Sequence, residues 1–292
     1  MISALSTSSA FRDALRSGAA LGAAYRLCLP REAMRGASGE RLGLSPGSSL
    51  DFHDYREYQP GDDLRRLDWS VYARSDKEIV KLFREEVSPK LEIILDASRS
   101  MDLPDTPKAA SALTLCAALA TAAANARCAC SLWFAAAELT PLAGAHSPPE
   151  TWTLPPAPFD SPLPPAAALS GHIGLRRNSI RVFISDLMWS APPEHSLRRL
   201  CDHAAALAVV QILGASEENP QASGSVRLED IENGATFDLA LDESACSAYR
   251  SALASHREEW NRECRRCGAA FVPLTAENLT LSPLERIGLI ER

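Results

Sequence analysis

The sequence predicts an α/β protein with a mostly parallel sheet flanked by helices, preceded by a loop-rich and β extension at the N-terminus. Three apolar runs have the length and continuity of buried parallel strands: 91–95, 180–185 and 207–213. Segments with apolar residues at helical spacing separate or follow these runs: 109–127, 192–206 and 242–267. Strand and helix therefore alternate along the chain, which is typical of a parallel sheet covered by helices.

Composition and charge exclude several classes of function. The 292 residues are 46% apolar and 23% charged, as in an ordinary globular protein, and the net charge is −7. A negatively charged chain has no general attraction for nucleic acid, so we expect no nucleic-acid partner. No run of about twenty strongly apolar residues is present, so we also expect no membrane span.

The N-terminal part, residues 1–50, is rich in Ala, Ser, Gly and Arg. We predict a loop-rich lead-in here, within which residues 9–22 have weak helical spacing. Asp13 and Arg16 interrupt the segment where an export signal would be continuously apolar. We therefore expect a cytoplasmic protein whose eight cysteines stay reduced.

Residues 51–89 carry a dense pattern of mixed charges with aromatic residues threaded through it. The run from Gln59 to Asp63 is a strong turn signal, and 79–83 has the pattern of a strand. Two interpretations are open: the Arg and Asp side chains pair across the turn, or the segment is a docking surface. The candidate partner-binding residues are Arg56, Tyr58, Asp62, Asp63, Arg65, Asp68, Trp69 and Arg74.

Residues 90–292 form the predicted main domain. The elements that follow its first strand are a helix at 109–127, strands at 128–134, 139–142 and 180–186, a helix at 192–206, a strand at 207–213, a long helix at 242–267, a strand at 270–273 and a terminal helix at 282–290. The proline-rich stretch 146–170 predicts a surface loop that ends in a short helix. Asn233-Gly234, between two alternating runs, predicts a β-hairpin.

Two of the apolar strands end on an aspartate, Asp96 and Asp186. Because the carboxyl ends of parallel strands meet at one edge of a sheet, these side chains are expected to lie near each other there. Asp96 also begins the pattern Asp96-x-Ser98-x-Ser100, which places a carboxylate and two hydroxyls on one tight turn. Such hard oxygen donors favour Mg²⁺, so Asp96, Ser98, Ser100 and Asp186 are the candidate metal ligands. The alternative is that these residues only cap the helices that follow.

The Asp-x-Ser-x-Ser turn resembles the metal-ion-dependent adhesion site of von Willebrand factor A domains. A longer pattern, Tyr55-x-x-Tyr58-x-Pro-Gly-Asp-Asp-Leu-Arg-x-x-Asp68-Trp69 with Lys81-x-Phe-x-Glu-Glu after it, resembles the signature of the bacterial family catalogued as domain of unknown function 58. The resemblance covers about residue 31 to the C-terminus. It implies a von Willebrand factor A-like (Rossmann-like) fold, with Asp96, Ser98, Ser100 and Asp186 at the matching metal positions.

The resemblance also implies a function, because members of that family are often encoded beside MoxR-type AAA+ ATPases. It implies a protein-binding or adaptor module in a chaperone-like ATPase system, with an acidic residue of the partner completing the Mg²⁺ site. The adhesion motif has a distant Thr that this sequence does not clearly supply. Its proline-rich loop offers Thr151, Thr153 and Ser161, and residues 159–163 are a degenerate counterpart.

The rival hypothesis is a metal-dependent hydrolase, in which Asp96 and Asp186 hold the metal and arginines of 56–74 hold an anionic substrate. Against it, no histidine is placed to assist. The chain also has no Walker A loop, no Gly-x-Ser-x-Gly and no His-Glu-x-x-His. The sequence therefore favours a non-enzymatic binding module.

Overall fold

The computed structural model describes residues 2–29, 50–59, 62, 64, 67–85, 90–171 and 174–292. The chain divides into two compact units, each described by itself. One unit joins Met1–Pro30 to Pro89–Arg292, and the other is Arg31–Ser88. Within the described ranges, no helix combines the length and the apolar character needed to cross a membrane.

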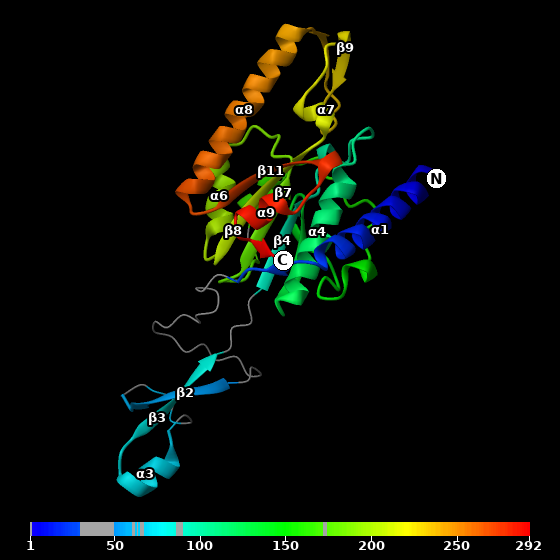
Figure 1. The fold of residues 1–292 in the computed structure, drawn as a ribbon. Helices are drawn as coiled ribbons and strands as arrows, with labels where there is room; N and C mark the ends of the chain where they lie inside the picture. The colour runs from blue at the N-terminus through cyan, green and yellow to red at the C-terminus, as the bar shows by residue number, and fades with distance from the viewer. Residues whose placement is uncertain are drawn as a thin grey trace. The chain divides into compact units, whose positions relative to one another are not determined.

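A six-stranded sheet lies at the centre of the larger unit (Figure 1). Its strand order is β11-β8-β7-β4-β5-β6, and every neighbouring pair is parallel except β5 and β6. The strands are β4 (Lys90–Asp96), β5 (Ala129–Ala135), β6 (Leu139–Pro141), β7 (Ile180–Ser185), β8 (Ala206–Leu213) and β11 (Ala270–Thr275). The predicted α/β class with a mostly parallel sheet is confirmed.

Helices cover both faces of this sheet because the side chains of each strand alternate between them. In β4, Ile93 and Leu95 pack with α1 and α4, whereas Ile94 packs on the opposite face with α5, α6 and α8. The helices are α1 (Ile2–Gly22), α4 (Lys108–Asn125), α5 (Pro165–Ser170), α6 (Pro193–Cys201) and α8 (Glu243–Arg266). The structure thus has one sheet between two helical layers.

The N-terminal lead-in contains the helix that the spacing at 9–22 predicted, but this helix begins earlier than we expected. Residues 2–22 form the single helix α1, which packs along α4. A Cβ atom on Gly18 would lie 2.2 Å from the carbonyl oxygen of Thr114, and one on Gly22 would lie 2.3 Å from that of Ala118. Gly18 and Gly22 therefore let the two helices approach closely.

The C-terminus also differs in part from the prediction. The terminal helix α9 (Ser282–Arg286) is shorter than expected and is followed by the two-residue strand β12 (Ile290–Glu291). This strand pairs antiparallel with β1 (Arg26–Leu27), so the two ends of the unit are joined by backbone hydrogen bonds. The pairing holds the end of α1 in place and closes the core on that side.

A buried ion pair joins the strands β4 and β7 at their amino-terminal half. The guanidinium of Arg181 lies 3.8 Å from a carboxylate oxygen of Glu92, and both side chains are buried. Glu92 also accepts a 2.7 Å hydrogen bond from the hydroxyl of Ser179, and Arg181 donates to the carbonyls of Leu200 and Asp202. These contacts fix the pairing of the two strands whose other ends carry the predicted site.

The predicted hairpin is confirmed as β9 (Gly224–Glu229) and β10 (Thr236–Leu241), paired antiparallel. Its loop is 230–235, longer than a two-residue Asn-Gly turn, and Gly234 has the positive φ of 72° that such turns require. The long helix α8 begins directly after the hairpin, where the Asp242 carboxylate accepts a hydrogen bond from the backbone N–H of Ala245.

The smaller unit, 31–88, contains a two-stranded antiparallel sheet and a short helix. Its strands are β2 (Leu50–Glu57) and β3 (Ile79–Glu85), and the helix between them is α3 (Trp69–Ser75). Asp68 caps α3, its carboxylate accepting hydrogen bonds from the backbone N–H groups of Ser70 and Val71. The strand predicted at 79–83 is therefore present and pairs with the one before the turn.

Candidate functional site

The two strands that end on aspartates lie side by side at the centre of the sheet. From β4 the chain continues to β5 on one side and later returns to β7 on the other. Leu95 pairs with Ile184, so Asp96 and Ser185 end their strands at the same level and Asp186 follows at once. In open α/β sheets, ligands bind outside the carboxyl ends of strands at this kind of switch in strand order. The expected meeting of Asp96 and Asp186 at one edge is confirmed.

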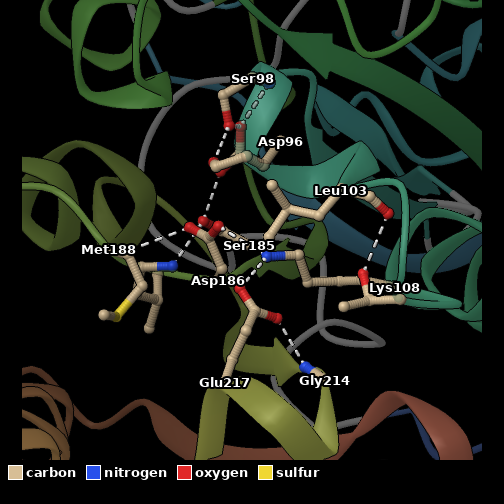
Figure 2. A network of polar contacts seen from close by, with 12 residues as sticks. Asp96, Ser98, Leu103, Lys108, Ser185, Asp186, Met188, Gly214 and Glu217 are labelled. Carbon is tan, nitrogen blue, oxygen red and sulfur yellow. Dashed lines mark hydrogen bonds and ion pairs between the residues drawn. The ribbon is translucent and has the colours of Figure 1, made fainter. Parts of the chain in front are cut away.

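The Asp96 carboxylate is wholly buried and accepts hydrogen bonds at both oxygens (Figure 2). Oδ1 accepts from the backbone N–H of Ser98 at 2.9 Å and from its hydroxyl at 2.6 Å, and Oδ2 accepts from the hydroxyl of Ser185 at 2.6 Å. Burial, and then the nearby negative charge of Asp186, raise the pKa of Asp96 to about 7, although the hydroxyl donors act against this shift. A cation beside this carboxylate would relieve the cost of holding its charge away from water.

The hydroxyl oxygens of Ser98 and Ser100 lie 3.0 Å apart and are hydrogen-bonded to each other. Neighbouring oxygen ligands of an octahedral Mg²⁺, with bonds of about 2.1 Å, are separated by about 3.0 Å. The spacing of the two serines thus fits adjacent positions of such an ion, and the carboxylate of Asp96 lies beside them. The donor set, one carboxylate and two hydroxyls, is of the hard type that Mg²⁺ prefers.

Asp186 is held by a residue that the sequence did not single out. The ammonium of Lys108, the first residue of α4, lies 3.2 Å from Oδ2 of Asp186 and 2.7 Å from Oε1 of Glu217. The Lys108 side chain is wholly buried. Oδ1 of Asp186 accepts a hydrogen bond of 3.0 Å from the backbone N–H of Met188. Asp186 therefore lies at the predicted edge, but its carboxylate is engaged by Lys108.

The loop after β7 is strained and tightly supported. Leu187 has a positive φ of 61°, which is costly for a residue with a branched side chain, and it is fully buried. Its backbone N–H donates to the Ser185 hydroxyl at 2.9 Å, and its carbonyl lies 2.9 Å from Nε2 of His256. Strain that persists under such support is often found at functional sites. His256, a residue of α8, thus anchors the loop that carries Asp186.

The proline-rich loop reaches the Asp-x-Ser-x-Ser turn at residues 160–161. Ser161 forms a parallel bridge with Ser98, with its N–H donating to the carbonyl of Ala97 at 3.1 Å. The Asp160 carboxylate accepts a 3.0 Å hydrogen bond from Nε of Arg99. The Ser161 hydroxyl instead donates to the carbonyl of Leu163. The segment expected as the counterpart of the distant Thr therefore lies beside the turn, but its hydroxyl faces its own loop.

A further acidic side chain reaches the site from the β9–β10 hairpin. Oε1 of Glu232 accepts a hydrogen bond of 3.0 Å from the backbone N–H of Ser100, across 132 positions in sequence. Its other oxygen, Oε2, is buried and has no hydrogen-bond partner among the described residues. A buried carboxylate oxygen without a partner is unfavourable, and a cation held at this turn would satisfy it. The residues present fit Mg²⁺ on this ground as well.

The candidate partner-binding residues of 31–88 divide into two groups in the described part. Arg56 and Asp62 form a two-point ion pair with contacts of 2.8 and 3.0 Å. Asp68 caps α3 and lies 3.1 Å from the ammonium of Lys81. These contacts agree with the first of the two interpretations, in which charged side chains of this segment pair with one another. Tyr58 is half-buried, and its backbone N–H donates to the carbonyl of Glu78.

The second group is exposed and has no such role in the fold. Trp69 is 61% exposed and stacks edge-on against Tyr72 at 6.1 Å between ring centres. Arg74 is exposed and donates from Nε to the carbonyl of Ser70. Asp63 and Arg65 lie outside the described residues. The docking interpretation thus depends mainly on Trp69 and its neighbours on α3.

A family model described as "Protein of unknown function DUF58" matches residues 54–259. The chain belongs to this family. This DUF58 protein is 28% identical to the uncharacterized proteins Rv1480 of Mycobacterium tuberculosis and Mb1516 of Mycobacterium bovis over 259 residues, which is 85% of the chain and 81% of each relative.

Two solved structures are also similar to this DUF58 protein. One is the conserved hypothetical protein BatB of Bacteroides thetaiotaomicron, with a TM-score of 0.38 and 14% identity over 68% of this chain and 95% of that one. The other is an aerotolerance-related membrane protein of Bacteroides fragilis, with a TM-score of 0.36 and 15% identity over 69% and 96%. Both scores are below 0.5, so neither likeness bears on function.

Sequence reasoning missed the residues that reach the DUF58 site from a distance. They are Lys108, Ser185, Glu217, Glu232 and His256. Ser185 was the one with a usable signal, because it directly precedes Asp186 at the end of an apolar strand. Lys108 and Glu232 look like ordinary surface charges in the sequence, since nothing near them shows where their side chains go.

Proposed function

We propose that this DUF58 protein is a non-enzymatic protein-binding module that docks a partner through Mg²⁺ held by Asp96, Ser98 and Ser100. The single observation that carries the proposal is the pair of serine hydroxyls, 3.0 Å apart, beside the buried Asp96 at the switch in strand order. When bound, Mg²⁺ would supply an electrophilic position for an acidic side chain of the partner.

Several residues of the chain would position the groups that hold such an ion. Oδ1 of Asp96 accepts a hydrogen bond from the Ser98 hydroxyl at 2.6 Å, and this contact orients the hydroxyl oxygen. The hydroxyl of Ser185 fixes Oδ2 of Asp96. Lys108 neutralises Asp186, which limits the negative charge at this edge. Ser100 supplies the second hydroxyl from the short 3₁₀ turn η2 (Arg99–Asp102).

The proposed fold relationship is to von Willebrand factor A domains, and the proposed partner is a MoxR-type AAA+ ATPase in a chaperone-like system. Membership of the DUF58 family and the Asp-x-Ser-x-Ser turn support this assignment. The exposed Trp69 on α3 offers a second contact point for the partner, because exposed aromatic residues often act as anchors in interfaces.

The hydrolase alternative finds no support in the site's contacts. Both oxygens of Asp96 already accept hydrogen bonds from hydroxyl groups, and both oxygens of Asp186 are engaged by Lys108 and Met188. The hydrolase hypothesis needs Asp186 as a second metal ligand, and the ammonium of Lys108 already pairs with Oδ2 of that carboxylate. The arrangement suits an ion that binds a partner better than an ion that activates water.

The test measures Mg²⁺ binding by calorimetry and capture of a purified MoxR-type ATPase from the same organism, with and without EDTA. We expect the unmodified chain to bind Mg²⁺ and to lose the ATPase in EDTA. The double variant Ser98→Ala/Ser100→Ala should lose both properties, and the exposed control Ser247→Ala should keep them. Capture that is unchanged in EDTA and in the double variant would contradict the proposal.

A further inference from the structure

Glu232 lies in a loop whose backbone is built to hold it in one place. The Asp230 carboxylate accepts hydrogen bonds from the backbone N–H of Glu232 at 2.9 Å and from the side-chain amide of Asn233 at 2.7 Å. Asn233 in turn accepts from the N–H of Ala235 at 2.8 Å, and Gly234 takes the left-handed turn position. The loop is therefore preorganised, so little conformational freedom remains to be lost when the Glu232 carboxylate engages a ligand.

The hairpin itself buries little of its own surface. Every side chain of β9 and β10 is exposed except Val226 and Leu241, which are half-buried. The contact of Glu232 with the N–H of Ser100 joins this exposed hairpin to the Asp-x-Ser-x-Ser turn. That contact leaves Oε2 buried with no hydrogen-bond partner in the described part of the chain, which is unfavourable unless a cation or donor meets it.

We infer that Glu232 is an internal acidic ligand of the Mg²⁺ site, which ties the β9–β10 hairpin to the sheet edge when the ion is bound. The inference rests on the proposed Mg²⁺ site. Its Oε1 contacts the backbone N–H of Ser100, whose hydroxyl lies 3.0 Å from that of Ser98, and its second oxygen supplies the additional carboxylate ligand that Asp186 does not. The carboxylate of Glu232 thus occupies the position that an acidic partner residue needs.

In this arrangement, either Glu232 or the partner binds the ion. The hairpin is therefore held at the site only when the partner is absent. A partner's carboxylate reaches the ion only when Glu232 leaves it, because both compete for the same face of the Ser98–Ser100 turn. Release of Glu232 frees the hairpin, whose exposed apolar side chains include Leu228, Phe237 and Leu239. The ion therefore couples occupation of the site to the freedom of residues 224–241.

The test compares the full chain with Glu232→Gln and with Glu229→Gln, a control on an exposed residue of the same hairpin. Calorimetry measures Mg²⁺ affinity, and hydrogen–deuterium exchange measures protection of amides in 224–241 with and without Mg²⁺. We expect Mg²⁺ to increase protection of the hairpin in the unmodified chain and in Glu229→Gln. Glu232→Gln should bind Mg²⁺ at least about tenfold more weakly and show no such increase.

The outcomes separate this inference from the proposed function. If the unmodified chain binds no Mg²⁺, both fail. If it binds Mg²⁺ but Glu232→Gln matches it in either affinity or hairpin protection, the inference on Glu232 is overturned and the Asp96–Ser98–Ser100 site stands. Circular dichroism checks that the variant is folded, which we expect because Glu232 lies in a loop at the end of an exposed hairpin.

Discussion

The ammonium of Lys108 lies 3.2 Å from the carboxylate of Asp186, and neither side chain has access to solvent beyond 3%. The two residues come from the start of α4 and from the loop directly after β7, 78 positions apart in sequence. Oppositely charged side chains persist in such a setting because each offsets the desolvation of the other. Lys108 also pairs with Glu217. These contacts engage the carboxylate of Asp186 and leave Asp96 as the aspartate proposed to hold the ion.

Lys108→Met is expected to destabilise the larger unit by about 3–5 kcal/mol, because it leaves the buried Asp186 without its counter-charge. Urea denaturation followed by circular dichroism measures the loss. The double variant Lys108→Met/Asp186→Asn should recover part of it, and Lys90→Met, on a partly exposed lysine, should cost much less. Equal stability of Lys108→Met and the unmodified chain would contradict the importance of the pair.

Ser185→Ala is expected to cost about 1–3 kcal/mol, because it leaves Oδ2 of Asp96 buried without its hydroxyl donor. The same change removes the acceptor for the N–H of the strained Leu187. We expect Mg²⁺ affinity to fall as well, since Asp96 loses its orientation. Denaturation and calorimetry on one preparation measure both effects. Ser131→Ala, on the half-buried face of β5, is the control, and a Ser185→Ala chain as stable as that control would argue against the role given to Ser185.

Gly18→Ala is expected to separate α1 from α4, because the new Cβ would lie 2.2 Å from a backbone oxygen that cannot rotate away. The cost should reach about 3 kcal/mol, the upper end for overpacking. Thermal unfolding measures it. Ser17→Ala, on the exposed side of the same helix, should leave stability nearly unchanged. A tolerated alanine at position 18 would show that the helices do not pack this closely.

The Asp68 carboxylate links the stability of the smaller unit to pH. Burial favours its neutral form, but the ion pair with Lys81 and the backbone N–H groups of Val71 and Ser70 outweigh this and lower its pKa below the ordinary 3.8. Because the folded pKa is lowered, the stabilisation is fully present above the unfolded pKa and is lost as pH falls through the folded one. We expect the stability difference between the unmodified chain and Asp68→Asn to be constant above about pH 5 and to shrink below pH 4. Carboxyl carbon NMR titration should place the Asp68 midpoint below 3.8, and a midpoint above it would contradict the pairing.

Trp69→Ala is expected to weaken capture of the ATPase while changing stability by no more than about 0.5 kcal/mol, because the ring is mostly exposed. The matched control is Leu64→Ala, which removes an exposed apolar side chain of the same unit. Capture assays and denaturation are run on both variants. If Trp69→Ala binds as tightly as Leu64→Ala, the docking role of α3 is excluded and the charged pattern serves the fold alone.

The strands and the two aspartates were accessible from the sequence because they depend on local pattern. An apolar run of the length of β4 or β7 forms a buried strand in almost any α/β context, and parallel strands necessarily end at the same edge. The hairpin around Asn233-Gly234 was accessible for a similar reason, since its turn needs a positive φ at glycine. Asp96, Ser98 and Ser100 follow from these features together.

The helix α1 was only weakly visible because its residues have modest amphipathic character. Its stability comes from the contact of Gly18 and Gly22 with α4, and most helical stability in proteins arises from such packing. Small residues in a sequence are compatible with a loop or with a close helix–helix contact. The partner helix, about 100 positions further on, settles which of the two forms.

By itself, the sequence determined the α/β class, the meeting of two aspartate-ended strands at one edge of the sheet and the oxygen-rich turn after β4. The tertiary structure alone decided three contacts. Lys108 forms an ion pair with Asp186, Ser185 donates a hydrogen bond to Asp96, and Glu232 accepts one from Ser100, 132 positions away. The physical reason is that strand formation depends on neighbours along the chain, whereas the partner of a buried charge depends on which distant side chains the fold brings within about 3 Å.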